Sequence, residues 1–194
     1  MTTTPWEETV LENDIVRMRP IRPEDEEGYA KIVFDPETWS YFLFRVDTAA
    51  DLASFMKTSL EVTRARERIC FTIFEKRTGQ IAGSMSFGND SPRDKRIEIG
   101  WSWLGKPFRG SGMNRWSKLA LLTHAFDVMD YERVEFKTDV LNQGARRGLI
   151  KIGAVEEGTL RSHTLMPSGR RRDTIYYSIL RGEWPAVKRA LRGE

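Results

Sequence analysis

The period of the apolar residues changes near the middle of the chain, and the stretch where it changes is rich in glycine. Residues 96–104 (RIEIGWSWL) alternate in period two, which predicts a strand with one face formed by Ile97, Ile99, Trp101 and Trp103. Beyond the glycines the apolar residues follow helical spacing, which predicts a long helix marked by Met113, Trp116, Ala120, Phe126 and Met129. A strand, a glycine-rich turn and a long helix indicate mixed α and β structure.

Further elements are predicted on both sides of this unit. Period-two runs predict strands at residues 14–19, 131–140, 160–166 and 174–180, and a β-hairpin at residues 68–87. Helical spacing predicts helices within residues 24–34, after Thr48, from Asn142 to Gly153 and around Trp184. No repeat, low-complexity segment or linker divides the 194 residues, so we expect one domain over residues 1–194.

Composition limits the classes of protein to which the chain can belong. The single cysteine, Cys70, excludes a disulfide framework, and with only two histidines we expect no metal site. The 31 Lys and Arg against 28 Asp and Glu give a net charge of +3, which does not demand nucleic-acid binding. Residues 1–10 lack the basic and apolar stretches of an export signal, and no apolar run is long enough to span a membrane. We therefore expect a cytoplasmic protein with no membrane partner.

The glycine-rich turn covers residues 107–114 (PFRGSGMN). Two glycines before a helix would let unpaired backbone N–H groups approach phosphate oxygens without a Cβ clash. The segment has neither the G-x-G-x-x-G dinucleotide pattern nor the Gly-Lys-Ser/Thr of a Walker loop. On these residues alone, an anion-binding loop and an ordinary strand-to-helix turn both stay open.

In their order, these segments resemble the GNAT N-acyltransferase superfamily, most strongly over the core region 96–154. The loop looks like the family's pyrophosphate loop, written Q/R-x-x-G-x-G/A. The segments EIGWSWLGKPFRGSGMNRW and LNQGARRGLIKIGAVEEGTLR are most similar to the subgroup of ribosomal-protein amino-terminal acetyltransferases. The resemblance implies an α/β (α+β) fold: a mixed, mostly antiparallel sheet of about seven strands, splayed at an acyl-coenzyme A cleft and flanked by helices.

The resemblance also implies roles for individual residues. It assigns the pyrophosphate to the backbone of Arg109, Gly110, Ser111, Gly112, Met113 and Asn114, with the Arg109 side chain available to a phosphate. Backbone N–H groups near Trp103 and Leu104 become the donors to the thioester oxygen. Asn142 matches an asparagine that contacts the pantetheine arm or a water near the thiolate, and asparagine is equally a common helix N-cap.

Two positions depart from the family pattern. The last Gly/Ala of the loop is Asn114, so the packing there must differ. The tyrosine that many members carry seven residues after the asparagine is Leu149, which leaves the usual general acid missing.

Glu98 is the candidate general base. An attacking amine with a pKa near 10 arrives as ammonium and must lose a proton, which a carboxylate in the cleft can accept directly or through a water. The alternative is an exposed strand glutamate paired with Arg96 on the same face. The resemblance implies direct attack of the amine on the thioester, with Glu98 and Asn142 as catalytic residues.

Candidate contacts to the acceptor come from two other segments. Trp39 and Tyr41 belong to an aromatic cluster that forms either a plug at the core edge or a wall of a substrate cleft. His163 could face the acceptor, although a lone strand histidine is more often a surface or packing residue. The arginines at 170–172 fit a solvated turn, a coenzyme phosphate site, an acidic acceptor site or an RNA site.

The resemblance implies an acyl-coenzyme A-dependent N-acyltransferase that moves acetyl from acetyl-CoA to a primary amine. A protein amino terminus, a polyamine and a small-molecule amine are equally compatible acceptors, and succinyl-CoA is an alternative donor. Two other classes stay open, a coenzyme-binding module without turnover and a ribosome- or RNA-associated protein. The resemblance makes a homodimer plausible; a nucleic-acid partner is not expected.

Overall fold

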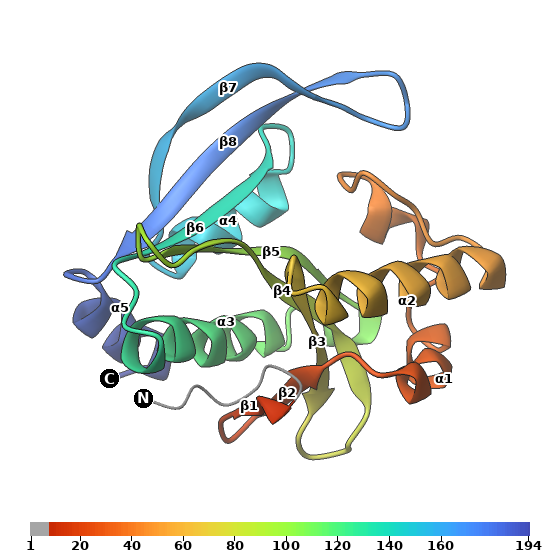
Figure 1. Cartoon of the computed structure of the whole chain (residues 1–194), viewed down its shortest axis with the longest axis horizontal. Coiled ribbons are helices and arrows are strands. Elements are labelled where there is room, and N and C mark those ends of the chain that lie inside the picture. The colour runs from red at the N-terminus through yellow and green to blue at the C-terminus, as the bar shows by residue number, and fades with distance from the viewer. Residues whose placement is uncertain (1–7) are drawn as a thin grey trace.

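The computed structural model describes residues 8–194, and its centre is an eight-stranded sheet in the order β1-β2-β3-β4-β5-β6-β8-β7 (Figure 1). The strands are β1 (Leu11–Glu12), β2 (Val16–Pro20), β3 (Arg68–Glu75), β4 (Ile81–Ser91), β5 (Arg96–Leu104), β6 (Arg133–Asp139), β7 (Val155–Leu165) and β8 (Arg171–Leu180). The helices are α1 (Glu26–Ala30), α2 (Ala49–Arg64), α3 (Met113–Thr123), α4 (Gln143–Lys151) and α5 (Trp184–Arg192). The mixed fold that we expected is confirmed, and the two-residue β1 adds a strand to the expected number.

All neighbouring strands pair antiparallel except β5 and β6, which run parallel. The β5–β6 pairing covers three residue pairs, from Arg96 with Arg133 to Glu98 with Glu135. Beyond the last pair β5 continues to Leu104 and β6 to Asp139. The two central strands therefore separate after a short paired segment.

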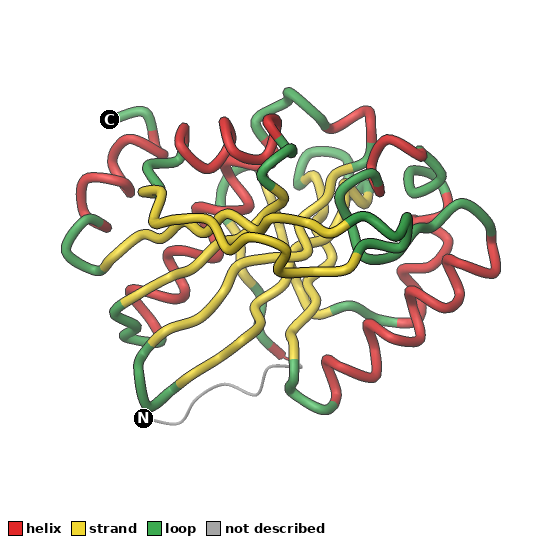
Figure 2. Tube along the Cα trace, turned by 90° about the horizontal axis from the view of Figure 1, so that it is seen from above, coloured by secondary structure: helices red, strands yellow, loops and turns green. Residues whose placement is uncertain are grey.

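Helices cover both faces of the sheet (Figure 2), and each face has its own core. Residues such as Ile99, Phe136 and Tyr177 point to the face covered by α3, α4 and α5, where they form the larger core. The opposite face carries a second core around Trp39 and Trp103, beside α1 and α2. Period-two alternation of apolar residues builds the first core, because it sends every second side chain to the same face.

A β-bulge interrupts this alternation in β5. Ser86 pairs with Gly100 and Ser84 with Trp103, so the two residues of β5 between these pairs oppose one residue of β4, and Trp101 adopts a φ of +50°. The bulge moves the Trp103 indole to the second core. Our prediction that Trp101 and Trp103 share a face with Ile97 and Ile99 is therefore wrong.

The helices before the glycine-rich loop and after it agree with the predicted bounds only in part. The helix expected within residues 24–34 shortens to α1 with a preceding 3-10 turn, η2 (Pro23–Asp25). α2 begins as expected after Thr48, which forms a capping box with Asp51. α3 passes at His124 into a π-helical turn, η5 (His124–Val128), so the predicted long helix ends in a different geometry.

β7 and β8 are longer than predicted and form an arm that arches away from the body of the molecule (Figure 1). Within residues 8–194, no helix is both long and apolar enough to cross a membrane. Residues 1–7 of the segment in which we expected no export signal lie outside the described residues.

Candidate active site

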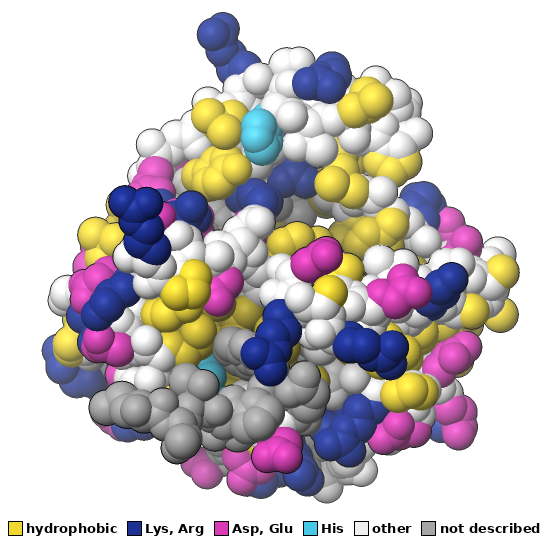
Figure 3. Space-filling model, viewed as in Figure 1, with side chains coloured by type: hydrophobic (Ala, Val, Ile, Leu, Met, Phe, Trp, Pro, Cys, Tyr) yellow, Lys and Arg dark blue, Asp and Glu magenta, His cyan; other side chains and the backbone are white. Residues whose placement is uncertain are grey.

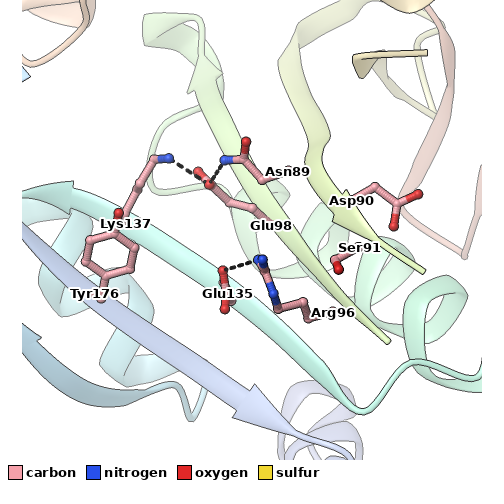
Figure 4. Close-up of a pocket in the computed structure, with 8 residues that line it drawn as sticks. All are labelled: Asn89, Asp90, Ser91, Arg96, Glu98, Glu135, Lys137 and Tyr176. Atoms are coloured by element: carbon pink, nitrogen blue, oxygen red, sulfur yellow. Dashed lines mark hydrogen bonds and ion pairs between the residues drawn. The ribbon is translucent and has the colours of Figure 1, made fainter. Parts of the chain in front are cut away.

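A polar pocket of roughly 500 Å³ lies where β5 and β6 separate (Figure 4). Its walls come from the end of β4, from β5, from β6 and from β8, and they are formed by Asn89, Asp90, Ser91, Arg96, Glu98, Glu135, Lys137 and Tyr176. It opens on the α1–α2 side of the sheet, because Glu98 shares its face with Gly88 and Arg68. On the side seen in Figure 3, the surface is hollowed between the β7–β8 arm and the body.

Glu98 lies at the inner end of this pocket and is only 4% exposed. Its Oε2 accepts a hydrogen bond from Asn89 Nδ2 at 2.6 Å and lies 2.9 Å from Lys137 Nζ (Figure 4). A Cβ at residue 100 would lie 2.7 Å from Glu98 Oε1, so the absent side chain of Gly100 leaves room for the carboxylate. The carboxylate therefore lies beside the point where the strands separate.

The alternative interpretation of Glu98 as an exposed partner of Arg96 is wrong. Arg96 pairs instead with Glu135 at 3.5 Å and with Asp94 at 3.9 Å. Glu135 also accepts a hydrogen bond from Arg133 at 2.8 Å. Sequence reasoning missed Asn89 and Lys137, because both contacts join residues of different strands.

His163 lies at the edge of the pocket region. Its Nδ1 is 3.1 Å from Thr174 Oγ1, and its ring packs edge-on against Tyr176, which lines the pocket. The structure thus places His163 beside a pocket residue, and its contact with an acceptor stays a prediction.

The two predicted aromatic contacts divide between core and surface. Trp39 is 1% exposed, donates from Nε1 to the Val33 carbonyl at 3.0 Å and packs against Trp103. This placement favours the core-edge interpretation for Trp39. Tyr41 is half-buried, and the cleft-wall interpretation stays a prediction for it.

The glycine-rich loop follows β5 after a 3-10 turn, η4 (Lys106–Phe108), and its residues from Arg109 to Gly112 are exposed. Gly110 and Gly112 have φ values of +75° and +88°, a left-handed conformation that glycine adopts without strain. A Cβ at Gly110 would meet nothing within 4 Å, and Gly112 is the N-cap of α3. An open loop backbone before the first helical N–H groups of α3 suits a diphosphate, so the residues present fit coenzyme A.

Arg109 is positioned differently from expectation. Its guanidinium pairs with Asp35 at 2.6 Å and with Thr38, and its Nε donates to the Leu104 carbonyl at 3.2 Å. Burial alone would raise the pKa of Asp35, but the hydrogen bonds from Arg109 and Thr38 outweigh it and hold that pKa below its ordinary value. The side chain thus joins the segment after α1 to the end of β5, and a phosphate contact stays a prediction.

Asn142 is the N-cap of α4, and its Oδ1 accepts a hydrogen bond from the Ala145 N–H at 3.0 Å. The capping role is confirmed, while a contact with the pantetheine arm stays a prediction. Asn114 reaches across from α3 to α4, where a Cβ at Gly148 would lie 3.8 Å from Asn114 Nδ2. The departure from the family pattern at residue 114 therefore lies where the two helices meet.

The arginines 170–172 do not form a free basic patch. Arg170 pairs with the buried Asp139, and Arg171 donates to Ser162. Arg172 is buried and donates from Nε to Thr174 Oγ1 at 3.2 Å. Cys70 is buried in the second core.

Over residues 8–194, no group of three or more His, Cys, Asp or Glu side chains is arranged to hold a metal ion. A sheet that splits at its parallel pair, a carboxylate beside the split and a phosphate-compatible loop at the end of β5 define a coenzyme A-dependent acyltransferase architecture. The family model described as "Acetyltransferase (GNAT) domain" matches residues 16–155. The chain belongs to the GNAT acetyltransferase family, whose members use acetyl-CoA as donor, and the resemblance stated above is confirmed.

Individual relatives agree with this family. The "Putative ribosomal N-acetyltransferase YdaF" of Bacillus subtilis is 27% identical over 180 residues, 91% of this chain and 97% of that protein. Among solved structures, a "putative acetyltransferase" from T. thermophilus has a TM-score of 0.85 at 33% identity, covering 100% of this chain and 98% of the other. A GCN5-related N-acetyltransferase from Brucella melitensis has a TM-score of 0.88 at 26% identity, with coverages of 96% and 85%.

Proposed function

We propose that this protein transfers acetyl from acetyl-CoA to a primary amine by direct attack of the amine. The observation that carries the proposal is the placement of Glu98: a buried carboxylate beside the separation of β5 and β6, in a pocket open to the α1–α2 side. The loop from Arg109 to Asn114 lies at the end of the same strand. One strand thus links a candidate base to a candidate coenzyme site.

Bound acetyl-CoA supplies an acyl group that is already activated as a thioester, so the protein's main tasks are positioning and charge stabilisation. The backbone of the loop and the first turn of α3 bind the pyrophosphate. Backbone N–H groups near Trp103 and Leu104 donate to the thioester oxygen. Asn142, already fixed as a helix cap, contacts the pantetheine arm or an ordered water.

Glu98 accepts the proton of the acceptor ammonium, directly or through a water. The hydrogen bond from Asn89 and the ion pair with Lys137 hold the carboxylate in one orientation. Tyr41 and His163 contact the acceptor, which enters from the pocket side. Leu149 carries no acidic proton, so this scheme leaves the donor to the leaving thiolate unassigned.

The relative named as a ribosomal N-acetyltransferase favours a protein amino terminus as acceptor, while a polyamine or a small amine fits the same chemistry. We place the protein in the cytoplasm, with a homodimer as a candidate active form. Succinyl-CoA is the alternative donor. The engaged arginines 170–172 argue against an RNA partner.

The test combines calorimetric titration with acetyl-CoA and a thiol-release assay against pooled amines. We expect binding and acceptor-dependent thiol release. Glu98→Gln should lower kcat by about 100-fold or more with little change in coenzyme affinity, because it removes only the proton acceptor. The matched control is Glu135→Gln on the paired residue of β6, which should keep most activity.

Binding without thiol release on a broad amine pool would instead favour a coenzyme-binding module. Absence of binding would refute the assignment of the loop. Equal losses in Glu98→Gln and Glu135→Gln would remove the assignment of Glu98 as the base.

A further inference from the structure

A buried lysine lies on the other side of the separation between β5 and β6 from Glu98. Lys118 projects from α3 and is 5% exposed. Its Nζ lies 5.9 Å from the centroid of Phe136, the first residue of β6 beyond the last β5–β6 pair. Phe136 points to the face covered by α3, α4 and α5, whereas Glu98 points to the pocket face.

The surroundings of Lys118 do not neutralise its charge. Its Nζ donates to Asn114 Oδ1 at 3.2 Å, and Asn114 in turn meets α4 at Gly148. Over residues 8–194, no carboxylate is found in an ion pair with this ammonium, and burial is the cause of its pKa shift. The contacts of its ammonium are an amide from α3 and a ring from β6, and because no nearby charge offsets the loss of water, burial lowers the pKa of Lys118 to about 8.

A buried ammonium without a counter-ion lowers the folding stability, and it gives up its proton more readily than an exposed one. With the pyrophosphate held at the first turn of α3, as proposed above, Lys118 would be one of the side chains between that turn and the gap between β5 and β6. Lys118 lies on α3 four residues beyond Asn114, one turn past the end of that loop. Leu149, beside Gly148, offers no competing proton donor on α4.

We propose that Lys118 is the general acid that protonates the coenzyme A thiolate as it leaves, an inference that rests on the proposed function. The C–N bond forms at the thioester carbonyl while the C–S bond breaks, and the electron pair of the broken bond stays on sulfur. The ammonium of Lys118 gives one proton to that sulfur, and the resulting neutral amine regains a proton from water. The acceptor ammonium loses two protons on its way to the amide: Glu98 accepts the first before the attack and passes it to water, and the regenerated carboxylate passes the second, released from nitrogen as the C–N bond forms, to water in the same way.

Two proton-transfer groups thus act from opposite faces of the sheet. Glu98 serves the nitrogen on the pocket side, and Lys118 serves the sulfur on the helix side. A thiol has an ordinary pKa near 8.5, close to that of the buried lysine, so proton transfer between them needs little driving force.

The first test measures the bound thiol and not turnover. Free coenzyme A is bound to the wild-type protein and to Lys118→Met, and the ultraviolet absorbance of the thiolate is followed against pH. The wild type should lower the pKa of the bound thiol by about one unit, because an ammonium beside sulfur favours the thiolate. Lys118→Met should abolish this shift, and Lys151→Met, on an exposed residue of α4, should keep it.

The second test separates charge from proton donation. Lys118→Arg keeps a cation that does not lose its proton at these pH values, so it should retain the thiol shift and still lower kcat by about 100-fold. In the wild type kcat should fall as pH rises through about 8, as Lys118 loses its proton, and this fall should be absent in Lys118→Met. Circular dichroism and thermal unfolding check that each variant is folded.

An unchanged thiol pKa, kcat and alkaline limb in folded Lys118→Met would overturn the role of Lys118 while leaving the transferase in place. Failure of the wild-type protein to bind coenzyme A would overturn the proposed function and this inference together.

Discussion

At the scale of single residues, the burial of the charged Lys118 side chain lowers the free energy of unfolding. Its pKa is 10.5 in an ordinary exposed setting and about 8 in the folded protein. The difference corresponds to about 3 kcal/mol of lost folding free energy while the folded-state amine is charged, that is, below pH 8. A residue retained at such a cost is typical of a functional site.

Lys118→Met should therefore raise the free energy of unfolding at pH 7 by about 1–3 kcal/mol, because methionine fills similar space without a charge. Between pH 8 and 10.5 the unfolded chain binds the extra proton, so wild-type stability gains with pH relative to the variant and the difference shrinks. Urea unfolding at pH 7 and near pH 10 measures it, with Lys151→Met as the control. A variant less stable than the wild type at pH 7 would contradict this account.

Part of the site could be predicted from single residues and part could not. Strand alternation predicts that Glu98 lies on the face opposite the apolar side chains of its strand, and an asparagine before a helical pattern predicts the cap at Asn142. The partners of Glu98 come from β4 and β6, and one sequence does not report which strands lie side by side. The sequence indicates only weakly that Lys118 is buried, because it lies at helical spacing before the buried Leu121 and Leu122.

At the scale of elements, the segment between α1 and α2 is held to the end of β5 by Arg109. The guanidinium pairs with Asp35 and Thr38 on that segment and with the Leu104 carbonyl on the strand. Because α1 and α2 border the face that holds the pocket, we expect this contact to affect acceptor binding as well as the coenzyme loop.

Arg109→Ala and Asp35→Asn should therefore raise the KM of the acceptor to a similar extent, about 3- to 10-fold, by releasing the same contact. The coenzyme dissociation constant of Asp35→Asn should stay within about threefold of the wild type, and the stability of both variants should change by less than about 1 kcal/mol because the pair is partly exposed. Steady-state kinetics and calorimetry measure both quantities. A loss of coenzyme affinity in Arg109→Ala alone would instead support a phosphate contact of this side chain.

Most element types could be read from hydrophobic periodicity, and the bulge in β5 shows why the rest could not. Periodicity predicts an uninterrupted strand over residues 96–104, yet Trp101 takes a left-handed conformation that a tryptophan rarely adopts. Tertiary contacts stabilise it: the Arg68 guanidinium lies 4.7 Å over the indole, and Trp103 gains a place among Tyr29 and Trp39. Such compensation involves residues far apart in sequence.

At the scale of the whole molecule, the sheet keeps two cores on opposite faces and still splits between β5 and β6. Antiparallel pairing on both outer sides holds the two central strands, β5 through β4 and β6 through β8. The split therefore persists without unfolding either core, and a ligand bound there adds its binding energy to the stability of the complete fold.

Coenzyme A at 100 times its dissociation constant should stabilise the folded state by about 2.7 kcal/mol, which raises Tm by about 5–10 °C in a domain of this size. Gly112→Trp should abolish this rise by filling the loop. Gly79→Trp is the matched control, because Gly79 also has a positive φ, +72°, and lies in the β3–β4 turn; a Cβ there would meet nothing within 4 Å, and one at Gly112 would make only an ordinary contact with Trp116 at 3.7 Å. Both variants carry a similar backbone strain and lose some stability without ligand, so only the ligand-induced rise in differential scanning fluorimetry separates them. A full rise in Gly112→Trp would show that the coenzyme binds away from the loop at the start of α3.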